Sequence, residues 1–457
     1  MGAYDKLLQY LPQVIAPTQK KLGLNVKLKW TLIVLLCFFL LKHIPLYGLG
    51  TASLAQFESL AVILGADFGS LISLGIGPLV TASIVMQLLT GSGILKMDTS
   101  SHAGRARFQG STRLLGIAFV IIESIAYVFM GGLTPLESLA GTSAYLLMQW
   151  VLIFQLILGG LMIVLLDDLT QKWGLGSGIS LFIAAGVSES LFIRLFSWFI
   201  PTGSSSPSGA IPLIIEAVGV GNSSLLLQEV AAIIATVLVF GIVIYVQSMK
   251  VEIPLSFGRI RGHGIRWPLN FLYTSVIPVI LIAALLANLQ LFSTLAQNRF
   301  GWEWAGSIAQ YTQAPRLFTL LVAEGFGAVP TALYIQSAVY AIVMMAGAVV
   351  FSYFWMQTSG MDARSQAKKI MQSGLQIPGF RKDPRVMEHV LDRYIVPLTV
   401  MGGLTIGFLA ALADISGALT SGTGLLLAVM VIYKMYEDVA KQHMEDMNPM
   451  MRKMMGK

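Results

Sequence analysis

Long apolar segments separated by shorter polar stretches run through the whole chain. Each apolar segment has about the 20 residues that a helix needs to cross the hydrocarbon core of a bilayer. The strands of a membrane β-barrel would instead be about ten residues long with alternating polarity. The pattern predicts ten transmembrane helices, at residues 30–47, 69–90, 113–131, 144–166, 178–200, 229–249, 271–292, 331–355, 394–413 and 417–436.

The polar stretch between the fifth and sixth segments divides the spans into two sets of five. It contains the low-complexity run Gly203–Gly209. Because five is odd, two halves that repeat each other must be inverted in the membrane. We therefore expect an all-α integral membrane protein with ten transmembrane helices in two inverted five-helix halves. The expected units are a cytoplasmic amphipathic segment at 1–29, the halves at 30–200 and 229–436, an external linker at 201–228 and a cytoplasmic tail at 437–457.

Glycine or proline interrupts the second span of each half. Ser73–Pro78 interrupts the start of the second span, and Ile277–Val279 breaks the seventh. Paired interruptions point to the functional site of inverted-repeat membrane proteins, although proline and glycine are also common in membrane helices without such a role. A separate apolar stretch at 52–65 is too short to span and predicts a re-entrant half-helix.

Composition and charge agree with a membrane protein and give its orientation. Of the 457 residues, 55% are hydrophobic and only 12% are charged, whereas soluble proteins have about 25% charged residues. A large soluble enzyme is therefore excluded. If the N-terminus is cytoplasmic, 26 of the 30 lysines and arginines lie on the inner side. This asymmetry predicts cytoplasmic termini, because basic residues concentrate in cytoplasmic loops.

The predicted spans carry little reactive chemistry. The single cysteine, Cys37, excludes an internal disulfide, and neither HExxH nor GxxxxGK[ST] occurs. Glu123 and Asp414 are the ionisable candidates within the spans, and the glycine-rich run Gly174–Gly178 favours close helix packing. We expect no catalytic residue, metal or cofactor. A secondary transporter, which needs ion ligands at depth, and an intramembrane protease, which needs a catalytic partner, are the alternatives.

Several longer motifs resemble one membrane-protein family over essentially the whole chain. Leu74–Gln87 is similar to the second span of the SecY family, the protein-conducting channel, and Gly176–Ile183 to its fifth span. Ile253–Gly262 resembles the loop after span six, Gly379–Lys382 the loop after span eight, and Gly422–Leu427 the tenth span. The loops are closer to the archaeal form. The resemblance implies a non-enzymatic subunit that passes unfolded polypeptides across the membrane and releases hydrophobic segments sideways.

The same resemblance implies where the parts of such a channel lie. A ring of apolar side chains would close the pore, corresponding to Ile76, Val80, Ile179, Ile183, Ile280 and Leu427. A plug helix within 52–65 would seal the outer side, with Ala52, Leu54, Phe57, Leu60, Ile63 and Gly65 among its residues. A lateral gate between spans two and three and spans seven and eight would be held by Thr81, Glu123 and Asn288.

Two inner loops carry clusters of basic residues. Positive-inside topology alone accounts for inner arginines, but such clusters also bind phosphate backbones. By resemblance they would dock the ribosome through its RNA, using Arg259, Arg261, Arg266, Arg381, Lys382 and Arg385. The other implied partners are nascent or unfolded polypeptides with signal sequences, two small membrane subunits (a clamp-type SecE-like subunit and a beta-type subunit) and the lipid bilayer of the cell membrane.

Overall fold

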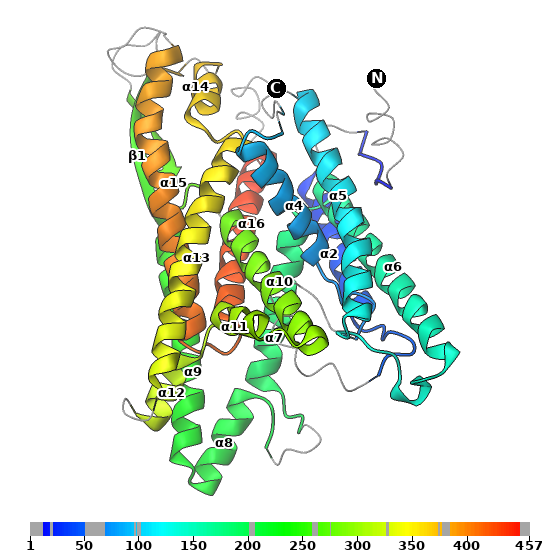
Figure 1. Ribbon diagram of the computed structural model, residues 1–457. Coiled ribbons are helices and arrows are strands. Elements are labelled where there is room, and N and C mark those ends of the chain that lie inside the picture. Colours follow the sequence, from blue (N-terminus) through cyan, green and yellow to red (C-terminus); the bar gives the residue numbers. More distant parts are fainter. Residues whose placement is uncertain are drawn as a thin grey trace.

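Long helices form the body of the protein in a computed structural model (Figure 1). The structure describes residues 12–18, 22–50, 69–95, 97, 102–200, 206–257, 264–274, 276–325, 329–372, 375–376 and 384–447. Within these residues, eight helices are long and apolar enough to cross a membrane. Two others, α4 and α16, carry the second and tenth predicted segments, so the fold is the expected ten-helix membrane architecture.

The helix bounds follow the apolar segments with extensions at several ends. The first half contains α2 (Leu24–Lys42), α4 (Gly77–Gly91), α5 (His102–Phe129), α6 (Ser143–Trp173) and α7 (Gly178–Phe196). The spans of the second half are α9 (Ser223–Ser248), α10 (Ile277–Phe300), α13 (Thr331–Thr358), α15 (Pro384–Ile415) and α16 (Gly422–Met447). Shorter helices are η1 (Glu137–Leu139), α8 (Ala210–Val220), α11 (Glu303–Thr312), α12 (Leu317–Glu324) and α14 (Ala363–Gln372).

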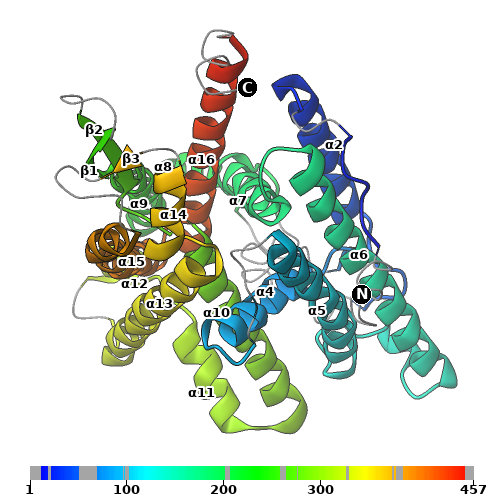
Figure 2. The same cartoon turned by 90° about the horizontal axis from the view of Figure 1, so that it is seen from above.

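The two halves lie side by side, and helices α4 and α7 of the first half contact helices of the second. Viewed from above, the helices of the first half occupy one side of the molecule and those of the second half the other (Figure 2). Helix α4 packs against α10 and α13, and α7 packs against α16. The main apolar core lies along these contacts, because it collects buried side chains from both halves. An ion pair at 3.5 Å between Arg194 of α7 and Glu229 of α9 also joins the halves.

Many large apolar side chains point away from this core. Leu32 on α2, Phe154 on α6 and Val237 on α9 are 60%, 61% and 64% exposed. A protein dissolved in water would not leave so much apolar surface uncovered. These outer helix faces are therefore suited to contact with lipid tails.

Three local features differ from the expectations. The segment 201–228 contains a helix, α8, and α9 already begins at Ser223. Residues 271–274 and 276 lie in bends and turns, so Pro278 lies in the first turn of α10 and starts this helix instead of breaking it. Proline is accommodated there because the first-turn N–H groups of a helix have no intrahelical acceptor.

A small antiparallel sheet lies at one end of the bundle, opposite the end that carries α8 (Figure 1). Strand β1 (Lys250–Phe257) pairs with β2 (Gly264–Asn270) along its length, and its last two residues pair with β3 (Leu375–Gln376). Together with α14 and the start of α15, the sheet encloses a second apolar core around Ile253, Leu269 and Leu391. The hydropathy pattern did not predict this sheet, since its strands lie in polar loops.

Candidate functional site: an apolar constriction and a polar seam

Helices α4 and α10 begin in the same way and face each other across the two halves. Each has a proline in its first turn, Pro78 in α4 and Pro278 in α10. Val80 and Ile280 each lie two residues after that proline, so they occupy matching positions in the inverted halves. Ile76 directly precedes α4, in the turns that interrupt the second span.

Helices α7 and α16 form a second matching pair. Each begins with a glycine that follows a serine: Gly178 starts α7 and Gly422 starts α16. Ile183 lies five residues after the first glycine and Leu427 five residues after the second. Ile183 and Leu427 therefore lie about one and a half turns after the start of their helices.

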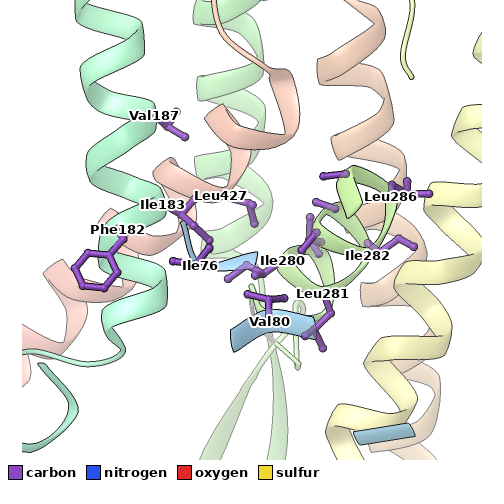
Figure 3. Close-up of a cluster of buried hydrophobic side chains, with 14 of the residues drawn as sticks. Ile76, Val80, Phe182, Ile183, Val187, Ile280, Leu281, Ile282, Leu286 and Leu427 are labelled. Carbon is purple, nitrogen blue, oxygen red and sulfur yellow. The ribbon is translucent and has the colours of Figure 1, made fainter. Parts of the chain in front are cut away.

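Five of the six proposed ring residues converge at the junction of these four helices. Figure 3 shows Ile76, Val80, Ile183, Ile280 and Leu427 pointing toward one another, and none is more than 5% exposed. The sixth, Ile179, is partly exposed and packs against the same core. Phe182, the neighbour of Ile183, points away from this group (Figure 3) and stacks on Phe38 of α2. Helix α7 thus directs adjacent residues to different surroundings.

A constriction lined only by branched aliphatic side chains is a barrier to ions and water. Such a lining offers no hydrogen-bond partner to replace lost hydration, so a narrow apolar passage dewets. Leucine, isoleucine and valine also impose no hydrogen-bonding preference on a chain that passes between them. The group can therefore seal the junction and still accept segments of varied sequence.

The three proposed gate residues are joined by hydrogen bonds across three helices. Asn288 on α10 donates from Nδ2 to Thr81 Oγ1 on α4 over 2.8 Å. The Thr81 hydroxyl lies 2.8 Å from the Gly77 carbonyl oxygen and 3.3 Å from Glu123 Oε1 on α5. Glu123 is 2% exposed and Asn288 is 7% exposed. The structure thus brings together a buried polar seam, centred on Thr81, between α4 of the first half and α10 of the second.

The sheet places the strand ends that precede the two proposed basic loops side by side. The first loop leaves β1 after Phe257 and returns at Gly264, and the second follows β3 after Gln376. Because Ser256 pairs with Gln376 and Phe257 with Leu375, the points at which the chain leaves β1 and β3 are neighbours, although the two antiparallel strands run in opposite directions. Arg259, Arg261, Arg381 and Lys382 lie outside the described residues, Arg266 is part of β2, and Arg385 is exposed near the start of α15.

The plug residues within 52–65 also lie outside the described part of the chain. What the structure describes on either side are Gly50 before the stretch and Gly69 after it. Leu46 N–H donates to the Gly69 carbonyl at 2.8 Å, so the chain leaves and returns at nearby points. The predicted half-helix therefore remains an expectation.

Two buried aspartates escaped the sequence reasoning. The apolar pattern ended the fourth span at residue 166, but α6 continues to Trp173 and buries Asp167 and Asp168. Asp168 forms ion pairs with Arg113 and, at 2.9 Å, with Lys172. Its Oδ2 also accepts a hydrogen bond from the Val14 N–H, while Lys172 donates to the Val14 carbonyl. The spacing of Asp168 and Lys172, four residues apart, was the available signal.

The described residues contain no group of three or more histidine, cysteine, aspartate or glutamate side chains that could hold a metal ion. The site they form consists of an apolar constriction and a hydrogen-bonded seam beside it. This arrangement suits the passage or release of an apolar or extended chain.

The comparisons with known proteins agree on one family. The SecY family model matches residues 70–436. The protein translocase subunit SecY of Methanothermobacter thermautotrophicus is 39% identical over 467 aligned residues, which cover 99% of this chain and 98% of the relative.

Solved structures with the same fold are similar in sequence as well. One, described as the structure of a protein-conducting channel, has a TM-score of 0.79 and 38% identity. A second, which concerns the plug domain of SecY and its stabilisation of the closed channel, has a TM-score of 0.77 and 39% identity. A third is Sec61 in the canine ribosome–channel complex, with a TM-score of 0.75 and 38% identity. Each alignment covers 96% of this chain and 96% of the other.

Proposed function

The chain belongs to the SecY family, and we propose from that premise that it is the central subunit of a protein-translocating channel. It passes unfolded polypeptides across the membrane and releases hydrophobic segments laterally into the bilayer. Its relatives are named protein translocase subunits and its structural neighbours protein-conducting channels. A secondary transporter is not favoured, because the ring residues that meet where α4, α7, α10 and α16 join are all aliphatic.

The observation that carries the proposal is the convergence of the apolar ring. Side chains from α4, α7, α10 and α16, two helices from each half, meet at one point (Figure 3). If the halves part slightly, these side chains separate and leave a passage along the junction. An extended peptide fills that passage and brings its own amide groups, so the aliphatic ring can close around it while ions remain excluded.

Crosslinking of a stalled nascent chain tests this route. The native Cys37 is first replaced by alanine, and a single cysteine is then introduced at Ile76, Ile183 or Phe182. We expect a translocating chain that carries one cysteine to form disulfides with positions 76 and 183. Position 182 is the matched control, because Phe182 lies next to Ile183 and points away from the ring. Equal crosslinking at 182 and 183, or none at any position, would contradict the proposed path.

The polar seam supports an assignment of α4 and α10 as the edges of a lateral gate. The Asn288–Thr81 hydrogen bond joins these two helices directly, and bonds of this kind between membrane helices contribute about 0.6–2 kcal/mol. A contact of that strength stabilises the closed seam but still allows the two helices to separate. A sufficiently apolar segment can then compete for the space between the helices.

The stretch 52–65 is proposed as the plug on the basis of its length, its sequence and the named role of a plug domain in a structural neighbour. Deletion of residues 55–65 should produce a channel that conducts ions in planar bilayers. The unmodified chain, measured at the same protein density, provides the reference. A membrane that stays silent after the deletion, while the variant protein is folded, would refute this role.

The inner face is proposed to bind ribosomal RNA through the two basic loops. Their shared origin at the β1–β3 pairing supports a single combined surface. A neighbour with 38% identity is described in a ribosome–channel complex. Opposed charges between arginine side chains and RNA phosphates would supply the affinity.

The remaining assignments follow from the family and the charge pattern. We propose a cell-membrane location with both termini cytoplasmic, since 26 of the 30 lysines and arginines fall on that side. Two small membrane subunits, one clamp-type and one beta-type, would complete the channel. The subunit has no proposed enzymatic activity of its own, so a translating ribosome or another partner drives movement through it.

A further inference from the structure

Two aspartates in matching positions of the inverted halves hold the first turns of α7 and α16. Asp167, near the end of α6, accepts a hydrogen bond at Oδ1 from the Ile179 N–H over 3.1 Å. Asp414, near the end of α15, accepts one at Oδ1 from the Thr423 N–H over 2.8 Å. Ile179 and Thr423 are both the second residue of their helix, so the two contacts are equivalent.

Both contacts depend on a glycine at the first helical position. A Cβ atom at Gly178 would lie 2.6 Å from the Asp167 Cα and 2.7 Å from its Oδ1. A Cβ atom at Gly422 would overlap the backbone of Ala413 and Asp414. Any larger residue would therefore push the helix start away from the aspartate. The same close approach is built twice, once in each half.

The second carboxylate oxygen of each aspartate is also occupied. Asp167 Oδ2 accepts from Gln171 Nε2 at 2.8 Å. Asp414 Oδ2 accepts from the Tyr340 hydroxyl of α13 at 2.7 Å and from the Thr423 hydroxyl. Within the described residues neither carboxylate forms an ion pair with a lysine or arginine. The free N–H groups and the positive end of the helix dipole supply the electrostatic complement instead.

These aspartates bear on the channel because of what the two helices carry. Ile183 and Leu427 lie within the second turn of α7 and α16, five residues beyond the glycines. The helices run in opposite directions: α7 leads toward the end with α8, and α16 leads toward the end with the sheet (Figure 1). A shift of either helix start would move one ring side chain along the junction.

We infer that Asp167 and Asp414 are positioning residues for the apolar seal, each fixing the axial position of one ring-bearing helix through its capping hydrogen bond. The inference rests on the proposed channel function. Beyond that function, each half has one capping aspartate, and this aspartate holds the ring side chain of α7 or α16 at its position along the helix axis.

Ion conductance of the purified full-length protein in planar bilayers tests this assignment. Asp167→Ala and Asp414→Ala should each increase the leak about fivefold, the change that loss of one helix cap produces in a two-state equilibrium. Asp167→Asn and Asp414→Asn should restore the seal, because the amide carbonyl can accept the same N–H. The matched control is Asp392→Ala, which removes an exposed aspartate from α15. Ile183→Gly serves as the positive control for ring opening.

The outcomes separate failure of the inference from failure of the function. If Ile183→Gly leaks and the alanine variants do not, the aspartates do not position the ring. Leaks of equal size in the alanine and asparagine variants would overturn the capping role as well. If Ile183→Gly itself does not leak, the ring proposal fails and the inference fails with it. Should the alanine variants not fold, Gly178→Ala displaces the start of α7 from Asp167, and absence of any leak in that variant would overturn the inference.

Discussion

Asn288 and Thr81 are 207 residues apart in the chain, yet Asn288 Nδ2 lies 2.8 Å from Thr81 Oγ1. This hydrogen bond joins the second helices of the two inverted halves, at the seam through which a lateral exit would open. The Thr81 hydroxyl is also 3.3 Å from the buried Glu123 carboxylate. One small side chain therefore links three helices, and its removal should weaken the closed seam more than any other single change there.

Replacement of Thr81 by valine tests the seam. The change keeps the side-chain shape, but it leaves Asn288 Nδ2 and the Glu123 carboxylate without this partner. An unsatisfied buried polar group costs about 1–3 kcal/mol, so the closed state should lose stability by that order. We expect the Thr81→Val variant to accept signal sequences that are less hydrophobic than those the unmodified protein requires. The measurement is membrane insertion of a series of signal sequences of graded hydrophobicity.

The control for this prediction is Thr294→Val on α10, where the hydroxyl bonds only to the Gln290 carbonyl of its own helix in the described structure. That variant should keep the original hydrophobicity threshold. An unchanged threshold in Thr81→Val, or an equal shift in both variants, would show that the seam does not set the threshold.

A polar side chain in the ring should hydrate the constriction. Ile280→Asn places an amide among aliphatic neighbours, and water that finds a hydrogen-bond partner no longer leaves the passage. We expect a rise in ion conductance of at least about tenfold in planar bilayers, which corresponds to ~1.4 kcal/mol. Leu289→Asn, on the same helix but 42% exposed, is the control and should remain sealed.

Charge reversal in the basic loops should weaken ribosome binding. Arg259→Glu combined with Arg381→Glu alters one residue in each loop that starts from the β1–β3 pairing. Affinity for ribosomes should fall, and the slope of log K against log salt should decrease by about 2, one for each lost phosphate contact. The control is Arg299→Glu, at the end of α10 that is farther from β2, and it should leave ribosome affinity unchanged. Equal affinities of the double variant and the unmodified protein at matched salt would contradict the prediction.

Asp168 should hold the N-terminal segment against α6. It is 3% exposed at its side chain, pairs with Arg113 and Lys172, and accepts the Val14 N–H. Asp168→Ala leaves two partly buried cations without their partner, so we expect a loss of about 3 kcal/mol in stability. Limited proteolysis should then cut near residues 12–18 faster than in the unmodified protein. Asp438→Ala, an exposed position on α16, is the control and should not change the cleavage rate.

Much of the architecture could be predicted because it is encoded in local composition. A run of about 20 apolar residues specifies a membrane helix wherever it occurs, and the distribution of lysine and arginine specifies its orientation. Glycine and proline marked where α4 and α10 begin, although Pro278 turned out to start its helix and not to break it. The end of α6 was misjudged because Asp167 and Asp168 are acidic yet buried, and Arg113, one ion-pair partner of Asp168, lies 55 residues away in the chain.

The sequence by itself determined the number of apolar segments, the division into two halves and the family motifs, and its basic residues predict an orientation. It could not determine which side of a helix faces the junction, since a membrane helix is apolar on the lipid side and the protein side alike. Ile183 and Phe182 are both buried and adjacent, and only the packing of α7 directs one to the ring and the other to Phe38. Likewise, the capping of α7 by Asp167 and of α16 by Asp414 appears only once helices from the same half fold back on each other. The loops between these helices differ in length, so the two contacts share no sequence spacing that a motif could show.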